Sequence, residues 1–185
     1  MKKTAFIIAV AILSVAQTKT YAQEKFGNTL NVGLGIGYYG YVSGTIPSFN
    51  INYEFDVAPT FTIAPFVTAY TYRNYIYWGD AYTPYRDYSY QRTVVPIGGK
   101  ATYYFDELLN AGKKWDFYAA GSVGFAIVKT DYEDGFGGNR GAYSGFSPLY
   151  IDAHLGGEFH FTPTTGAYLD LSTGLSTFGL AIHFK

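Results

Sequence analysis

The chain has 185 residues, of which 48% are hydrophobic, and a formal net charge of −1, which together indicate a single domain. It contains no cysteine, which excludes a disulfide-stapled scaffold, thiol catalysis, a cysteine metal site and a lipoprotein anchor. The lack of net positive charge argues against nucleic acid as a partner, because phosphate recognition needs a basic face.

The first 22 residues have the pattern of a secretory signal peptide. Two lysines at the start precede an apolar core over residues 5–16, and Ala22 closes a small-residue cleavage site. The apolar core is shorter than the roughly 20 residues that a membrane-spanning helix needs. We therefore expect a cleaved signal peptide over residues 1–22 and one exported domain over residues 23–185.

The rest of the chain alternates apolar with polar or small residues at a period of two, which is the pattern of β-strands with two unlike faces. Eight segments of this kind are predicted, over residues 28–38, 49–57, 61–72, 91–105, 115–128, 149–161, 167–172 and 177–184. The second is the most regular, with Phe49 and Ile51 on one face and Asn50 and Asn52 on the other. Most segments have the length that a tilted strand needs to cross a bilayer.

The connections between the predicted strands are unequal in length. Those after the second, fourth and sixth segments are short or polar turns, whereas residues 73–90 and 129–147 form long connections. Short turns on one side and longer external loops on the other are typical of transmembrane barrels.

The connection over residues 73–90 is the candidate partner-binding loop, because aromatic residues are concentrated in it. Its candidate contact residues are Tyr75, Tyr77, Trp78, Tyr82 and Tyr85. Tyr and Trp provide a large contact area at a small entropic cost and recur in binding surfaces. A second interpretation fits equally well, in which the two flanking strands extend above the membrane as an aromatic hairpin.

Aromatic residues also recur where the predicted strands approach the short turns. Each of these strand ends carries an apolar residue followed two positions later by an aromatic one: Tyr53/Phe55, Tyr103/Phe105, Phe159/Phe161 and Ile182/Phe184. Four such pairs at one depth predict an aromatic ring at a membrane–water boundary.

The last predicted strand resembles the sorting signal of bacterial outer-membrane barrels. Its signal residues are Thr177, Gly179, Ile182 and Phe184, and Lys185 follows where the signal more often stops on the aromatic residue. The mature chain as a whole resembles the small eight-stranded outer-membrane barrels of the OmpX, OmpW and OmpA-barrel kind, and the compact outer-membrane β-barrel proteins of Bacteroidota.

This resemblance implies an all-β fold, an eight-stranded antiparallel up-and-down transmembrane β-barrel, in the cell outer membrane of a Gram-negative bacterium. It also implies contact with outer-membrane lipid and lipopolysaccharide, and with the barrel-insertion machinery during biogenesis.

A soluble barrel of the lipocalin type, with its apolar face inside, is the alternative fold. Against it, the polar face carries mostly Gly, Ala, Ser, Thr and Tyr, whereas a solvated face would be rich in Lys and Glu. In the membrane orientation, side chains just fill an eight-stranded lumen. The predicted lumen polar network consists of Asn50, Asn52, Glu54, Lys100, Asp152, His154 and Glu158. Because buried charges need partners, Lys100 is expected to pair with Glu54 and Glu158.

No catalytic, cofactor or metal residues are predicted. Lipid A deacylases of this architecture use a His-x-Ser motif, which is absent after His154, His160 and His183, and neither long connection contains the external histidine of the palmitoyltransferase type. Four inward positions of one strand, Asp152, His154, Glu158 and His160, span about 26 Å and cannot meet at one metal ion. Adjacent pairs could hold an ion weakly, but a satisfied polar network is favoured.

The sequence thus favours a non-enzymatic outer-membrane barrel whose surface loops, residues 73–90 and 129–147, have structural or interaction roles, in adhesion or as part of a complex. The partner would be a surface protein, a polysaccharide or a larger membrane complex. Two alternatives stay open, a lipid-A-modifying enzyme and a narrow transport conduit.

Overall fold

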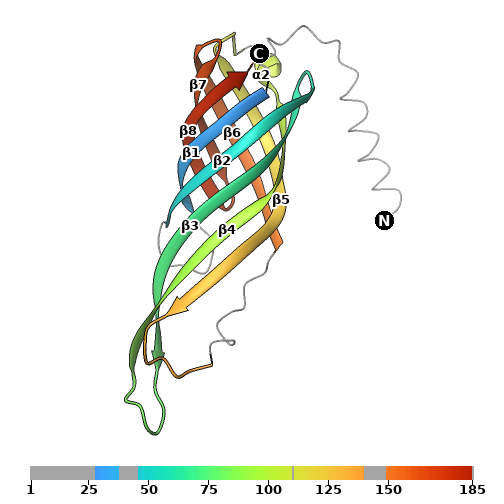
Figure 1. The fold of residues 1–185 in the computed structure, drawn as a ribbon. Coiled ribbons are helices and arrows are strands. Elements are labelled where there is room, and N and C mark those ends of the chain that lie inside the picture. The colour runs from blue at the N-terminus through green and yellow to red at the C-terminus, as the bar shows by residue number, and fades with distance from the viewer. Residues whose placement is uncertain (1–27, 38–45, 110, 140–148, 185) are drawn as a thin grey trace, which may run out of the picture.

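The computed structural model describes residues 28–37, 46–109, 111–139 and 149–184. Its elements are the strands β1 (Asn28–Gly37), β2 (Ile46–Ala58), β3 (Phe61–Trp78), β4 (Arg86–Tyr104), β5 (Trp115–Tyr132), β6 (Leu149–Thr162), β7 (Thr165–Ser172) and β8 (Leu175–Phe184), and the helix α2 (Asp106–Leu109). Each strand pairs antiparallel with the next and β8 pairs with β1, so the sheet closes into a barrel (Figure 1). The predicted eight-stranded antiparallel up-and-down barrel is confirmed.

The signal peptide expected over residues 1–22 lies outside the described residues. Among the residues that are described, no helix has the length and apolar character to cross a membrane.

The prediction that residues 73–90 form a long loop is wrong. β3 continues to Trp78 and β4 begins at Arg86, so only residues 79–85 connect the two strands. The extended aromatic hairpin, the second interpretation of these residues, is the observed one. Tyrosine has a high strand propensity. Because aromatic residues occur at adjacent positions here, the two faces of the strands differ little, and the period-two alternation is not visible in the sequence. The predicted connection over residues 129–147 is also partly strand, because β5 runs to Tyr132, and residues 140–147 are outside the described part.

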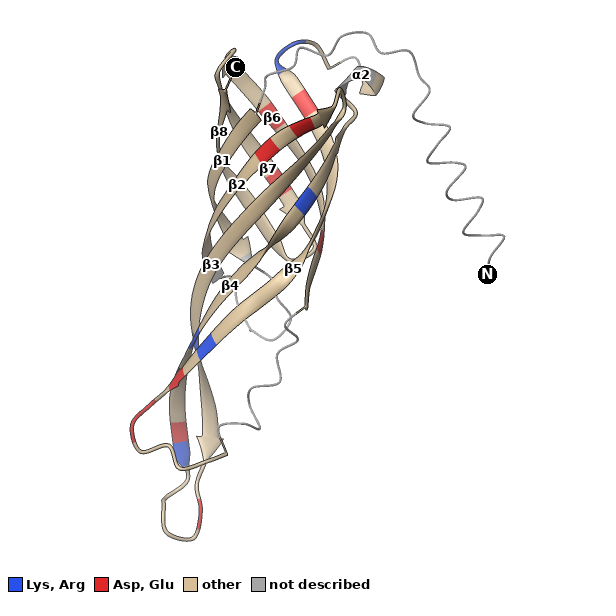
Figure 2. Ribbon diagram, turned by 45° about the vertical axis from the view of Figure 1, so that its right-hand side comes forward, with Lys and Arg blue, Asp and Glu red and all other residues tan. Residues whose placement is uncertain are grey.

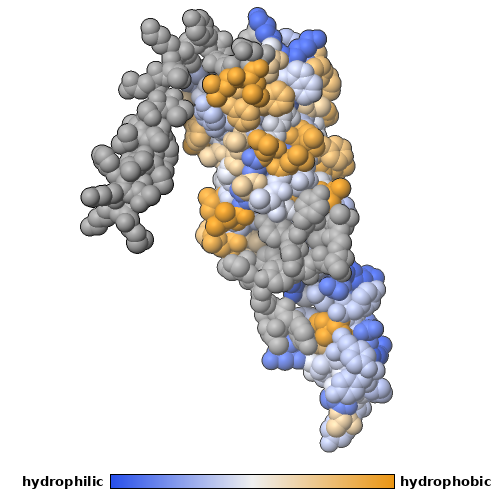
Figure 3. Space-filling model, turned by 180° about the vertical axis from the view of Figure 1, so that it is seen from behind, coloured by the Kyte–Doolittle hydropathy of each residue, from blue (hydrophilic) through white to orange (hydrophobic). Residues whose placement is uncertain are grey.

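The outer face of the barrel wall is apolar (Figure 3). Side chains that are at least 40% exposed on it include Phe49, Phe55, Ile63, Val67, Ile97, Val123, Phe125, Ile151, Leu155, Leu169, Leu171, Phe178 and Leu180. A monomer in water rarely exposes so continuous an apolar surface, whereas a lipid-facing band of this kind is the defining feature of a transmembrane barrel. The predicted orientation is confirmed, and the lipocalin-type alternative is wrong.

α2 and the end of β8 lie at the same end of the barrel (Figure 1), and two groups of aromatic side chains are in contact near this end. The Tyr53 ring lies 4.9 Å from the Phe55 ring and 6.0 Å from the Phe184 ring. On the other side of this end, the Phe159 ring lies 4.8 Å from that of Trp115. These contacts join three of the four predicted pairs to aromatic neighbours, and the complete ring at the membrane boundary stays a prediction.

Glycines on the inner face make room for large side chains in the lumen. A Cβ atom on Gly33 would lie 2.2 Å from the hydroxyl oxygen of Tyr168. Likewise, a Cβ atom on Gly156 would lie 2.3 Å from the Tyr118 ring. The Gly-rich pattern thus reflects a crowded interior.

Three strands leave the barrel on the side opposite α2. The pairing of β2 with β3 ends at Ser48 and Tyr70, and that of β5 with β6 ends at Phe125 and Leu149. β3, β4 and β5 nevertheless stay paired with one another beyond this level. We call this projecting three-stranded sheet, residues 71–93 and 129–136, the extension (Figure 1). From Tyr70 to Trp78 it adds about 27 Å of strand.

Candidate functional site

Two parts of the molecule carry chemistry, the polar lumen and the extension. Figure 2 shows the charged residues on the strand segments around the lumen, near the turn beside α2, and on the extension. In the lumen, Glu54 accepts hydrogen bonds from Asn31 (2.9 Å), Thr62 (2.6 Å) and Tyr104 (2.7 Å). Three donors on one buried carboxylate offset much of the cost of removing it from water.

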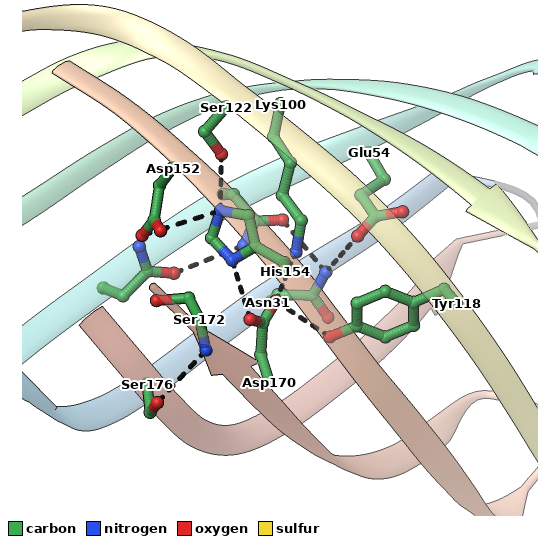
Figure 4. Close-up of polar contacts among 12 residues, drawn as sticks. Asn31, Glu54, Lys100, Tyr118, Ser122, Asp152, His154, Asp170, Ser172 and Ser176 are labelled. Carbon is green, nitrogen blue, oxygen red and sulfur yellow. Dashed lines mark hydrogen bonds and ion pairs between the residues drawn. The ribbon is translucent and has the colours of Figure 1, made fainter. Parts of the chain in front are cut away.

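The prediction that Lys100 pairs with Glu54 and Glu158 is wrong. The Lys100 ammonium lies 2.6 Å from a carboxylate oxygen of Asp170, which reaches across the lumen from β7 (Figure 4). Tyr118 also donates to Asp170 at 3.0 Å. Strand alternation identifies the inward residues but not which of them meet across the barrel, and this choice depends on strand tilt and register.

The other predicted network residues also face the lumen or border it, but they form separate groups rather than one. Asn52 is 3.0 Å from Asn31, and Asn50 donates to Thr68 at 2.7 Å. Asp152 accepts hydrogen bonds from the backbone N–H groups of Gly174 and Leu175, at 2.9 and 3.3 Å, and so fixes the turn between β7 and β8.

Ser122, His154 and Asp170 have the distances of a nucleophile–base–acid chain (Figure 4). The Ser122 hydroxyl is 2.8 Å from His154 Nε2, and His154 Nδ1 is 2.7 Å from Asp170. The cavity beside them has a volume of about 20 Å³, enough for one water molecule and not for an acyl chain. Ser122 itself is buried. The described contacts of this chain of hydrogen bonds are to other lumen side chains, whose positions it helps to fix.

A second histidine group lies nearer the end that carries α2. Glu158 and His160 on β6 and His183 on β8 place one ligand atom each within 4.8 Å of one another, and all three residues are buried. Positions along a single strand do not reveal this set, because His183 is contributed by a strand that is not adjacent to β6. The fact that His183 falls on the inward face of its own strand was the available signal.

The extension has an apolar inner side. Ile76, Tyr88 and Phe136 are buried there, and the Phe136 ring lies 5.5 Å from the Tyr88 ring. Trp78 packs on both of these rings, at 5.5 and 5.9 Å. Of the five predicted contact residues, Trp78 therefore belongs to the core of the extension.

The four predicted tyrosines lie on the solvent side of the extension. Their exposed fractions are 62% for Tyr75, 69% for Tyr77, 97% for Tyr82 and 64% for Tyr85. The Tyr77 and Tyr85 rings are 5.8 Å apart. The extension thus exposes four tyrosine rings to solvent, and its apolar core holds the sheet that carries them.

Two carboxylates fix the shape of the extension. Glu133 accepts hydrogen bonds from the backbone N–H (2.8 Å) and the hydroxyl (3.0 Å) of Ser89, and lies 3.4 Å from Arg86. These bonds hold the pKa of Glu133 below its ordinary value, and the bond from the backbone N–H of Ser89 lowers the pKa most. At the tip, Asp80 accepts from the backbone N–H groups of Tyr82 and Thr83, and the first of these bonds lowers the pKa of Asp80 most.

The predicted sorting residues occupy both faces of β8. Ile182 and Phe184 point outward, and Thr177 is buried in the lumen. Gly179 lies opposite Gly33 on β1, where a Cβ atom would meet the backbone oxygen of Val32 at 2.1 Å. Glycine at this position is therefore needed for β8 to close the barrel against β1.

No protein-family model and no curated protein matches the chain. Among solved structures it is similar to Neisserial surface protein A, with a TM-score of 0.53 and 16% identity, covering 85% of this chain and 96% of that one. It also aligns with Ail, the attachment invasion locus protein of Yersinia pestis, in complex with the heparin analogue sucrose octasulfate, with a TM-score of 0.48, 7% identity and coverage of 85% and 96%. A third match is the N-terminal β-barrel domain of Pseudomonas aeruginosa OprF, with a TM-score of 0.48, 10% identity and coverage of 85% and 98%. At these identities, the likeness to Neisserial surface protein A establishes the barrel fold alone.

Proposed function

We propose that the protein is a non-enzymatic barrel of the outer membrane whose extension is an interaction surface, in adhesion or as the docking point of another subunit. The observation that carries this proposal is the exposure of Tyr75, Tyr77, Tyr82 and Tyr85, between 62% and 97%, on β3 of the extension and on the turn that follows it. Because the sheet that carries these rings is already packed, the rings lose little further conformational entropy on binding, which favours affinity.

A protein partner fits this surface better than an anionic polysaccharide. The exposed residues among the rings include Arg73, Asp87 and Gln91, so both signs of charge are present. Aromatic residues surrounded by mixed polar groups are typical of protein interfaces, whereas a polyanion would be matched by a run of basic residues.

The lumen supports a role without transport or catalysis. Buried side chains from both halves of the barrel meet across it, as in the contact between Lys100 and Asp170. The enclosed position of Ser122 argues against chemistry on lipid A, because a lipid acyl chain outside the wall cannot reach its hydroxyl. Export through a cleaved signal peptide over residues 1–22, and recognition of β8 by the insertion machinery, belong to the same proposal.

The test is capture of a partner from native membranes. The protein would be extracted in mild detergent, and co-purifying proteins and glycans would be identified for the wild type and for Tyr75→Ala/Tyr77→Ala/Tyr85→Ala. We expect normal insertion and loss of the captured protein in the triple variant.

The matched control is Tyr75→Phe/Tyr77→Phe/Tyr85→Phe, which keeps the rings and should retain most of the capture. Equal capture by wild type and the alanine variant would contradict the proposal. Loss of a glycan rather than a protein would redirect it to a polysaccharide ligand.

A further inference from the structure

We propose that Glu158, His160 and His183 form a binding site for one divalent transition-metal ion in the lumen. Glu158 Oε1 is 2.7 Å from His183 Nε2 and 3.5 Å from His160 Nδ1. The two imidazole rings are 5.0 Å apart. Two nitrogens and one carboxylate oxygen thus converge from β6 and β8 on one point inside the barrel.

Each imidazole is oriented from its far side. His160 Nε2 lies 2.7 Å from the Asp116 carboxylate on β5, and His183 Nδ1 lies 2.9 Å from the Thr29 hydroxyl on β1. The opposite nitrogens, His160 Nδ1 and His183 Nε2, are therefore the ones directed at Glu158. A carboxylate or hydroxyl behind the outer nitrogen is the usual support of a metal-bound histidine, because it fixes the tautomer and the ring angle.

A glycine gives the site its space. β7 runs between β6 and β8, and its residue Gly166 pairs with His160 on one side and Ala181 on the other. A Cβ atom on Gly166 would lie 2.2 Å from Glu158 Oε1. Any other residue at this position would displace the carboxylate from the point where the three donors meet.

The donor set selects the class of ion. Imidazole nitrogen with a single carboxylate suits Zn²⁺, Co²⁺, Ni²⁺ or Cu²⁺, whereas Ca²⁺ and Mg²⁺ prefer sites made of oxygen. Donors at about 2.1 Å from a tetrahedral ion are about 3.4 Å apart. The separations of 2.7 and 3.5 Å from Glu158 bracket this value, and all three donors lie within 4.8 Å of one another, so small side-chain shifts would bring them to one ion, with a fourth position left for water.

The site is buried but lies near the end of the barrel that carries α2. His160 lies two residues before the end of β6, and His183 lies one residue before the end of β8. An ion would pass only the rim of the barrel, whereas the crowded middle around Asp170 would block a longer path.

The test uses the whole protein, purified without a histidine tag in detergent and stripped with a chelator. Titration with Co²⁺ should produce the visible absorption bands of a four- or five-coordinate ion, saturating at about one ion per chain. Cu²⁺ bound to the same protein should show nitrogen hyperfine splitting in its electron paramagnetic resonance spectrum. Binding should weaken as the pH falls from 7.5 to 5.5, because protons compete for the imidazoles.

Variants identify the ligands. His160→Gln, His183→Gln and Glu158→Gln should each weaken binding at least about tenfold, and Asp116→Asn should weaken it by about 10-fold through the orientation of His160. Gly166→Ala keeps every donor and should still reduce affinity. The control is His154→Gln, which removes the third histidine of the chain, about 13 Å from Glu158 and about 20 Å from His160 along β6, and should leave binding unchanged.

Two results would overturn the proposal. One is the absence of saturable one-to-one Co²⁺ binding by the folded wild-type protein, which needs no variant. The other is binding that survives in folded His160→Gln and His183→Gln proteins, or that His154→Gln abolishes, since either would place the ion elsewhere.

Discussion

Three strands, β3, β4 and β5, belong to both the barrel and the extension, yet the inner and outer faces of the two regions are reversed in polarity. On β3 the even-numbered residues point inward throughout, from Thr62 in the barrel to Ile76 in the extension. In the barrel the outward residues are apolar, such as Ile63 and Val67, whereas in the extension they are Arg73 and the exposed tyrosines. The backbone continues unchanged, so the reversal marks the level at which the surroundings change from lipid to water.

The same reversal occurs on β5. Val123, Phe125 and Ile127 are between 58% and 64% exposed on the outer face, and the next outward residues are Lys129 and Asp131. The two strands place the boundary at the same level, because Lys129 and Thr71 both pair with Thr93 of β4. Outside this boundary, stability comes from apolar packing under the sheet, and inside it from satisfied polar groups in the lumen.

The largest expected effect comes from breaking the polar lumen. Lys100→Met leaves the Asp170 carboxylate buried without its cation and should lower the free energy of unfolding by about 3–5 kcal/mol. Urea unfolding in lipid vesicles measures this loss. The double variant Lys100→Met/Asp170→Asn removes both charges and should recover at least half of it. A single variant as stable as wild type would show that the contact is not important for stability.

The local stability of the extension should depend on its own apolar core and not on the barrel. Phe136→Ala removes a ring buried between Tyr88 and Tyr132 and should cost about 3 kcal/mol of local stability. Amide exchange of residues 86–92 should then accelerate by about 100-fold, while residues of β6 to β8 keep their protection. Uniform acceleration across the barrel would contradict the division into two regions.

An arginine distinguishes the two outer faces. Val123→Arg faces lipid near the middle of the wall and should destabilise the barrel by about 2 kcal/mol or more. Tyr75→Arg faces water on the extension and should change barrel stability by less than about 0.5 kcal/mol. The pair is measured by unfolding in vesicles, and equal effects would refute a membrane boundary between these positions.

The smallest effect is a pH dependence confined to the extension. The pKa of Glu133 is held below its ordinary value of 4.5, so its bonds to Ser89 stabilise the folded extension above that pH and are lost as the pH falls through the lowered pKa. Tyrosine fluorescence or amide exchange should report loosening of the extension in acid. In Glu133→Gln this pH dependence should disappear, and its persistence would assign the transition to another group.

The barrel could be predicted from the sequence because its two faces meet different solvents. The alternation of Phe49 and Ile51 with Asn50 and Asn52 fixes the strand and its orientation without any tertiary information. The extension was harder, since Tyr75 and Tyr77 on one face and Ile76 and Trp78 on the other are all large and weakly polar or apolar, and residues 73–90 resemble a loop in composition.

The contacts across the lumen could not be predicted at all. Alternation places Lys100, Asp170 and His183 on the inner face, but strand tilt and register decide that Lys100 meets Asp170 and that His183 meets Glu158. Both choices join strands that are not neighbours in the sheet, and nothing in the local sequence encodes them.

Cysteine scanning along β3 tests the central claim most directly, because the chain contains no native cysteine. Single cysteines at Ile63, Val67, Thr71, Tyr75 and Tyr77 would be labelled in membranes with a membrane-impermeant maleimide. Ile63→Cys and Val67→Cys should be protected by lipid, and the three variants from Thr71 outward should react rapidly. Reaction of Ile63→Cys and Val67→Cys as fast as Tyr75→Cys would contradict the account, because the outer face of the barrel would then lie in water.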